Sequence, residues 1–251
     1  MIRAIYSEWI KYKRTPIPWL IILSPFAIVL ISAYYASLQP IDGNTWLAIF
    51  DNMNQIWSGA WVPFGWGLIS GLATNIEKSS GNWRSLRVTD KSPGILFASK
   101  ILLLVMLVLF SALLLVVFSY LAGQIIGISN EFPLKEFVVP MIVNWIAGLP
   151  ILIISLWLAE VLGWGVSVGV GAIGILIASI IGGTTVGGDI WAFVPWSWPM
   201  KLTYIDYALI TNTLPSSVPI NTFWVVLLVA VVLSFVIAIA SVWWFQRREV
   251  K

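Results

Sequence analysis

Six long apolar stretches constrain this chain more than any other feature of its sequence. They occupy residues 17–38, 57–76, 95–126, 137–162, 164–182 and 222–245. A helix needs about 20 predominantly apolar residues to cross the hydrocarbon core of a bilayer. Inside that core a backbone must satisfy its own hydrogen bonds, which favours helices. The sequence therefore predicts an all-α integral membrane protein, with six transmembrane helices in a single domain that covers residues 1–251.

The composition excludes several other classes of protein. Hydrophobic residues make up 59% of the chain and charged residues only 10%, whereas soluble domains carry about 25% charged residues. Cys and His are both absent, which excludes disulfides, thiolate or imidazole metal sites and Cys or His catalysis. No cluster of catalytic acids or bases is visible within the spans. We therefore expect neither an enzyme nor a cofactor in this chain, and the net charge of +3 does not indicate nucleic acid.

The polar segment over residues 77–100 predicts the orientation. It carries five basic residues against two acidic ones, and loops rich in Lys and Arg face the cytoplasm. With this loop inside, twelve of the fourteen basic residues are also inside, and only Lys135 and Lys201 are external. We expect both termini to be cytoplasmic and residues 39–56 to form an external loop, in which Trp46, Phe50 and Trp57 serve as interfacial anchors.

The N-terminal residues 1–15 have the pattern of an amphipathic helix that lies in the membrane surface. Apolar residues recur at helical spacing, and basic residues surround them; the apolar positions are Ile2, Ile5, Tyr6, Trp9 and Ile10. An alternative is a basic tail that only anchors the first span.

Three features within the spans point to specific contacts. Gly67 and Gly71, four residues apart in the second span, would allow another helix to approach closely. The third span is longer than a bilayer requires, and we expect its Lys100 end to project into the cytoplasm or the helix to tilt. Glu160 is the only ionisable residue near a span interior. It is either a functional intramembrane charge or a capping carboxylate at the interface.

The segment between the fifth and sixth spans combines glycines, prolines and aromatic residues. We expect the glycine-rich stretch 182–188 to break the helix, and the residues after it to form short re-entrant or interfacial helices at the outer leaflet. A cargo platform or outer gate is one interpretation, and an ordinary aromatic belt is the other. The candidate residues are Trp191, Trp196, Trp198, Tyr204 and Tyr207.

Two short motifs carry a resemblance to a known family. Residues 7–15 read SEWIKYKRT, and residues 77–86 read ExxxGNWRxL. Together with six spans in about 250 residues, they resemble the ABC-2 type permeases and are most similar to the permease subunits of lantibiotic-immunity transporters. The resemblance implies a cytoplasmic coupling helix between the second and third spans that docks into an ATPase. Its residues would be Asn82, Trp83, Arg84, Ser85, Leu86 and Arg87. Trp83 and Leu86 form one i, i+3 pair of apolar anchors, and Arg84 and Arg87 form a second, basic pair.

The same resemblance implies a function in a bacterial plasma membrane. A cytoplasmic ABC ATPase in two copies would bind ATP and magnesium, and a second related permease or a second copy of this chain would complete the complex. The complex would expel a membrane-active antibacterial peptide from the bilayer and so protect the producing cell. Two alternatives stay open: an ABC-2 permease for a lipid, a polysaccharide or a drug, and a non-transporting membrane sensor or assembly protein.

Overall fold

The computed structural model describes residues 2–79, 92–214 and 220–247, with the side chains of residues 2, 3 and 77–79 left out. Within these ranges the regular secondary structure is entirely helical. Five helices are long and apolar enough to cross a membrane, and their ends lie within three residues of the predicted spans. They are α2 (Ile17–Ser37), α6 (Pro93–Ile126), α7 (Leu134–Val161), α8 with the π-helical turn η2 (Trp164–Ile177 and Ala178–Gly182) and α10 (Ile220–Arg247). The all-helical membrane fold is thus confirmed.

The region of the predicted second span has a different form. A continuous helical path runs through α3 (Thr45–Ile56), the π-helical turn η1 (Trp57–Trp61) and α4 (Val62–Ser79). This path is not among the five apolar helices. The predicted external loop over residues 39–56 is wrong from Thr45 onward, because those residues are helical.

The prediction that Trp46, Phe50 and Trp57 are interfacial anchors is also wrong. These side chains are buried in the protein core, with exposed fractions of 4%, 0% and 0%. Positions 46, 50 and 57 share one helical face, and that face packs inward. Phe50, for example, meets the ring of Phe137 at a centroid distance of 5.5 Å. The aromatic residues therefore belong to the core of the bundle.

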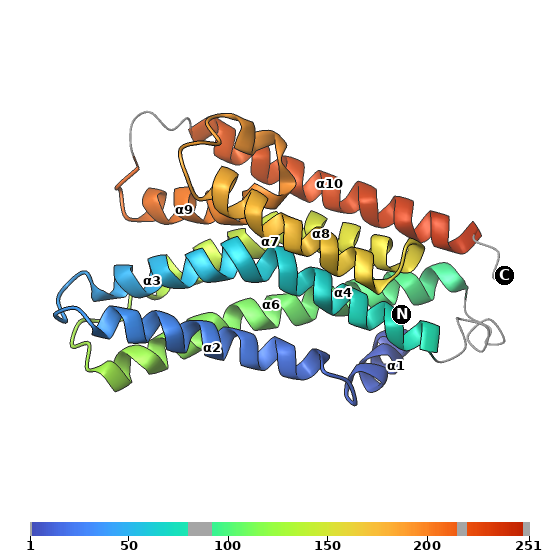
Figure 1. Cartoon of the computed structure of the whole chain (residues 1–251), viewed down its shortest axis with the longest axis horizontal. Helices are drawn as coiled ribbons and strands as arrows, with labels where there is room; N and C mark the ends of the chain where they lie inside the picture. The colour runs from blue at the N-terminus through green and yellow to red at the C-terminus, as the bar shows by residue number, and fades with distance from the viewer. Residues whose placement is uncertain (1, 80–91, 215–219, 248–251) are drawn as a thin grey trace.

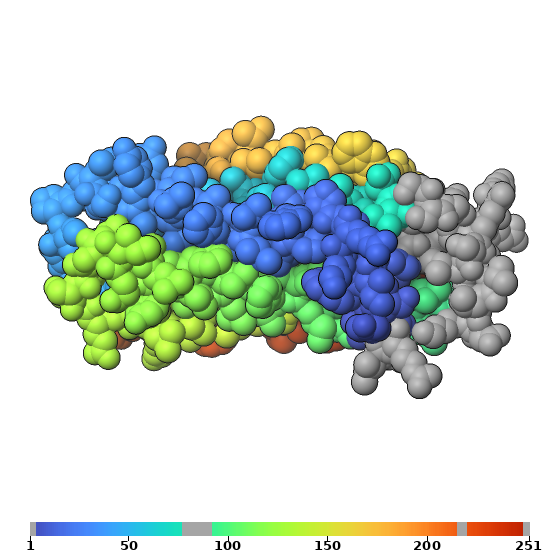
Figure 2. Space-filling view, turned by 90° about the horizontal axis from the view of Figure 1, so that it is seen from below, coloured from blue at the N-terminus to red at the C-terminus, as the bar shows by residue number. Residues whose placement is uncertain are grey.

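The helices form an elongated bundle with two distinct ends (Figure 1). One end holds α1 (Ile2–Tyr12), the end of α4, the start of α6 and the end of α10; we call it the α1 end. The opposite end holds α3 and the short helices η3 (Ile190–Phe193), η4 (Pro195–Ser197) and α9 (Trp198–Ile210); we call it the α9 end. Within the bundle α7 packs against α4, α9, α10 and α6, while α2 packs along α6. Figure 2 shows α2 and α6 side by side, with α1 at one end of them.

Glycines allow α4 and α8 to pack at close range, as the pair Gly67 and Gly71 predicts. A Cβ added at Gly67 would lie 2.8 Å from the carbonyl oxygen of Ser167, and one at Gly71 would lie 3.2 Å from that of Trp164. The Ser167 hydroxyl donates a hydrogen bond to the Gly67 carbonyl at 2.8 Å. A side chain at Gly67 would force the two helices apart.

The α1 end contains buried polar side chains. Lys100 is fully buried, and its Nζ donates to the carbonyl oxygen of Ala73 in α4 at 3.3 Å. α4 therefore covers this part of α6, and the projection of the Lys100 end into the cytoplasm or the tilt of the helix stays a prediction. Glu160 is fully buried near the end of α7, and Glu8 of α1 is 1% exposed. Glu8 accepts from Lys11 Nζ at 2.6 Å.

A two-residue connection joins α7 to α8. Only Leu162 and Gly163 lie between Val161 and Trp164. Gly163 has φ 107°, a left-handed conformation that glycine adopts without the steric cost of a Cβ. The two helices run antiparallel from this turn and pack against each other.

Candidate functional site

A buried polar network crosses the apolar interior towards the α9 end. Asn144 of α7 is at its centre: the two N–H groups of Nδ2 are shared among three acceptors, the Ser58 hydroxyl at 2.6 Å, the Thr203 hydroxyl at 3.0 Å and the Pro199 carbonyl at 3.1 Å. Its Oδ1 accepts from Trp57 Nε1 at 3.1 Å. One amide side chain thereby joins η1, α7 and α9, three elements that are distant in sequence.

The side chains of the network are fully buried inside the protein. Asn144, Ser58, Thr203 and Asn54 are each 0% exposed, and the Ser58 hydroxyl donates onward to the Asn54 side chain. In a medium of low dielectric constant, bonded polar groups attract strongly, while an unpaired one is costly. The arrangement therefore favours one relative position of the three elements over others.

Two π-helical turns flank this network. η1 and η2 contact each other, and Gly59 in η1 marks the point of closest approach. A Cβ at Gly59 would lie 3.3 Å from Met200 Sδ and 3.4 Å from the Ser179 hydroxyl of η2. π-Helical turns inside α-helices occur frequently at functional sites. Here both interruptions lie at the same depth of the bundle, against the start of α9.

Two of the five aromatic candidates of this segment are buried. Trp191 and Trp198 are 6% and 3% exposed, and Trp198 Nε1 donates to the Ala192 carbonyl at 3.1 Å. Trp196 is half-buried. The apolar side chains that face outward are others: Ile190 is 61% exposed and Phe193 is 84% exposed.

Tyr204 and Tyr207 of α9 are half-buried. Tyr207 stacks on Phe50 of α3 at a centroid distance of 4.1 Å. Burial raises the pKa of Tyr207 to about 12, with further contributions from Asp51 and Glu136. The two rings therefore help to hold α9 against α3 as neutral phenols.

At the α9 end, burial disfavours the charged form of two carboxylates, Asp206 and Asp51. Asp206 of α9 is 7% exposed, and burial raises its pKa to about 6, an effect that the positive charge of Lys135 partly offsets. Burial also raises the pKa of Asp51 in α3. Both residues lie outside the five apolar spanning helices. Among the residues that the structure describes, no group of three His, Cys, Asp or Glu could hold a metal ion.

The sequence interpretation missed Asn144, Ser58 and Thr203 because it searched the spans for ionisable residues only. Asn144 interrupts the apolar run VVPMIVNWIAGL, and a lone amide in such a run is a recognisable signal for contacts between helices. Ser58 and Thr203 carry no comparable signal, since isolated hydroxyls are common in apolar helices.

The predicted coupling residues, Asn82 through Arg87, lie outside the described residues. The helices on either side of them, α4 and α6, reach the α1 end (Figure 1). In α1, Tyr6 is 65% exposed and Ile10 is 52% exposed, while Ile5 and Trp9 are half-buried. The side chain of Ile2 is not described.

Comparison with known proteins identifies the family. Residues 4–162, more than half of the chain, match the family described as ABC-2 family transporter protein. Neither the curated proteins nor the solved structures give a match. The family comprises transmembrane subunits, and it implies partnership with an ABC ATPase. The matched region and the apolar helices together show that the chain belongs to the ABC-2 transporter family, as a membrane permease component.

Proposed function

We propose that this chain is the permease subunit of a transporter that expels a membrane-active antibacterial peptide and so gives the producing cell self-immunity. A separate cytoplasmic ATPase, in two copies with ATP and magnesium, drives the cycle. A second related permease or a second copy of this chain completes the complex in the bacterial plasma membrane. The observation that carries the proposal is the buried network around Asn144. It joins α9 to η1, the π-helical turn between α3 and α4.

The network supports transport for a physical reason. A transporter must alternate between arrangements of its helices, and each needs defined contacts. A set of four hydrogen bonds on one amide fixes the closed arrangement of η1, α7 and α9, and breaking the set releases all three elements together. Outward-facing Ile190 and Phe193 would then offer an apolar surface to an amphipathic peptide.

The proposal includes six spans with both termini in the cytoplasm. Five are the long apolar helices, and η1 with α4 forms the remaining one, which is second in chain order. Single cysteines at Asn44 and Ser129, exposed residues at the α9 end, should react with an impermeant thiol reagent added to intact cells. A cysteine at exposed Lys13, near the α1 end, should react only in opened membranes. The chain has no native cysteine to interfere. Labelling of the Lys13 position in intact cells would overturn this orientation.

The proposed coupling helix is tested by Trp83→Ala combined with Leu86→Ala. Loss of two desolvated anchors should remove about 2–4 kcal/mol from the interface with the ATPase. Co-purification of the ATPase should fall while the amount of permease in the membrane is unchanged, and Thr89→Ala serves as a control in the same segment. Undiminished co-purification and undiminished ATP-dependent efflux would refute the assignment.

The cargo is tested at the exposed residues of the α9 segment. Ile190→Asn combined with Phe193→Asn should lower tolerance of the peptide, measured per molecule of permease in the membrane. Leu38→Asn is the matched control, because Leu38 is 62% exposed at the same end but lies outside the segment. Replacing Trp191 and Trp198 is a poorer test, since buried tryptophans also contribute to folding. Normal tolerance in the double mutant, with efflux of a lipid, polysaccharide or drug instead, would favour the alternative cargoes.

A further inference from the structure

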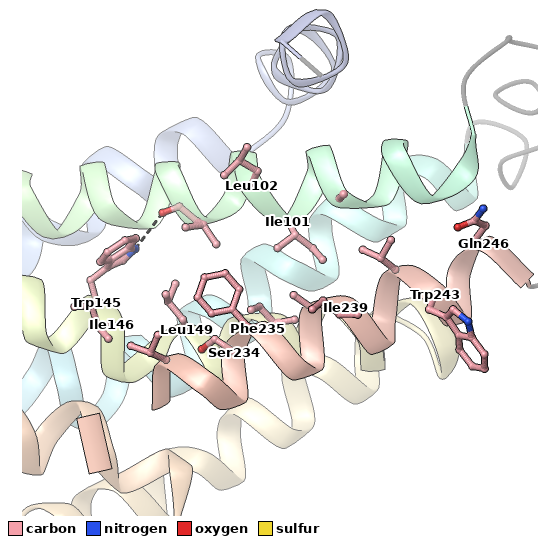
Figure 3. Close-up of a pocket in the computed structure, with 16 residues that line it drawn as sticks. Ile101, Leu102, Trp145, Ile146, Leu149, Ser234, Phe235, Ile239, Trp243 and Gln246 are labelled. Atoms are coloured by element: carbon pink, nitrogen blue, oxygen red, sulfur yellow. Dashed lines mark hydrogen bonds between the residues drawn. The ribbon is translucent and has the colours of Figure 1, made fainter. Parts of the chain in front are cut away.

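A groove opens between α6, α7 and α10. Its volume is about 720 Å³. α6 forms one wall with Leu102, α10 forms the other with Phe235 and Ile239, and α7 lies at its base with Trp145 (Figure 3). Phe235 is 65% exposed and Ile239 is 68% exposed. The groove therefore opens sideways, towards the hydrocarbon of the bilayer.

Two specific contacts join the helices that form the groove. At the α1 end Phe97 of α6 stacks on Phe245 of α10 at a centroid distance of 4.7 Å. At the opposite end Trp145 Nε1 donates to the Val105 carbonyl at 3.1 Å, which joins α7 to α6 (Figure 3). In the space that these helices line, no side chain of the described residues fills the groove.

The groove is apolar along its length and polar at one end only. Two polar side chains line it, Ser234 and Gln246. The Ser234 hydroxyl already donates to the Ala230 carbonyl at 2.7 Å. Gln246 is at the α1 end, and beside it the guanidinium of Arg247 stacks over the ring of Trp243 at 4.0 Å. The groove thus combines a long apolar channel with an exposed cation, Arg247, which does not line it but stacks on the lining residue Trp243 at the α1 end.

The length of the groove fits a membrane lipid. From Val231 to Gln246 the wall formed by α10 spans fifteen residue-to-residue steps, which corresponds to about 22 Å at 1.5 Å per step. One leaflet contributes about 15 Å to the hydrocarbon core. An acyl chain that starts at the α1 end would therefore remain in the groove across the whole of its leaflet. Trp243 and Arg247 are residue types that favour the headgroup region.

We propose that this groove is a binding site for an anionic phospholipid, with one acyl chain along Leu102, Phe235 and Ile239 and the phosphate at Arg247 and Gln246. The proposal depends on the membrane location of the chain and is independent of its cargo. A neutral headgroup would leave the Arg247 charge unmatched, and the apolar walls exclude a free polar anion. A lipid is the ligand that matches both parts of the site.

The test uses the full-length permease in vesicles of equal parts phosphatidylcholine and phosphatidylglycerol. Each lipid is added in turn as a tracer with a photoactivatable acyl chain, and labelled peptides are identified by mass spectrometry. We expect the phosphatidylglycerol tracer to label the groove peptides of α6 and α10 about fivefold more than the phosphatidylcholine tracer, the preference that one basic residue confers. Arg247→Gln should bring this ratio close to one, and Arg247→Lys should retain it.

A second pair of variants tests the groove itself. Ile239→Trp should fill the channel and lower labelling by both tracers several-fold. Leu228→Trp, on the same helix, places the same side chain at a residue that is 64% exposed and outside the groove, and should leave labelling unchanged. If Ile239→Trp does not fold, Ala98→Leu on the α6 wall replaces it.

Three results would overturn the proposal. The first is uniform labelling along the exposed face of α10, which means ordinary contact with bulk lipid. The second is an unaltered preference for phosphatidylglycerol in Arg247→Gln. The third is displacement of both tracers from the groove by a second copy of the chain or by an antibacterial peptide, because the groove would then be a protein or cargo interface.

Discussion

Helices α7 and α10 are equal in length, yet they occupy opposite environments. Each has 28 residues, and their mean hydropathies of 2.3 and 3.1 both qualify them as membrane spans. In α7, 61% of the most apolar window is buried inside the protein, whereas in α10 the figure is 22%. Hydropathy alone identifies both as spans and does not show which one the protein surrounds.

The difference lies in the residues that interrupt the apolar pattern. α7 contains Pro140, Pro150, Gly148 and the amide of Asn144, whereas α10 has neither proline nor glycine. Lipid tails are as apolar as a protein core, so bulky apolar side chains are equally stable against either. In α7 the amide of Asn144 bonds to other helices, and Gly148 lies against the ring of Trp66. These contacts distinguish α7 from α10.

The largest effect is expected from Asn144→Leu in α7. The substitution leaves the N–H of Trp57 without a partner inside the core and removes the donor that Ser58 and Thr203 share, which should cost about 2–4 kcal/mol. Thermal unfolding of the purified protein in detergent would measure the loss. Ser234→Ala in α10 is the control, since its hydroxyl bonds only within its own helix. Equal unfolding temperatures for the two variants would contradict the contrast between the helices.

A smaller effect is expected from Gly148→Leu. A Cβ at this position of α7 would already overlap the ring of Trp66, and overpacking of this kind costs about 1–3 kcal/mol. On α10 the exposed Ala240 allows the same enlargement towards the lipid. We expect Ala240→Leu to unfold at the wild-type temperature, measured in the same assay. A comparable loss in both variants would show that α10 also packs against protein on this face.

The smallest effect concerns pH at the α9 segment, which packs on α7. Because burial raises the pKa of Asp206 to about 6, the folded protein holds its proton more tightly than the unfolded chain. The resulting stabilisation is complete below the ordinary pKa of 3.8 and is lost as the pH rises through about 6. Asp206→Asn should abolish this part of the dependence of unfolding temperature on pH, whereas Glu131→Gln, at an exposed residue, should retain it. An unaltered pH profile in Asp206→Asn would remove Asp206 as its source.

The sequence predicts most of the fold because five spans are long, continuous and apolar. It fails at residues 45–56, where Asp51 and Asn54 lower the hydropathy of a segment that the bundle nevertheless covers. The sequence also does not show the burial of Lys100, which depends on α4 supplying the carbonyl of Ala73. The candidate site is less predictable still. Asn144 is visible as an isolated amide, but its partners Ser58 and Thr203 are defined only by tertiary contacts.

The short connection at Gly163 limits how the helices can move relative to one another. A connection of only Leu162 and Gly163 is too short to let the adjoining ends of α7 and α8 move apart. The two helices therefore stay in contact at the α1 end. Any separation of this pair must therefore increase with distance from the connection and be greatest at the opposite tip. There η2 lies against the start of α9. A small angular change at the connection would be amplified along the length of the bundle into the widest displacement beside the Asn144 network.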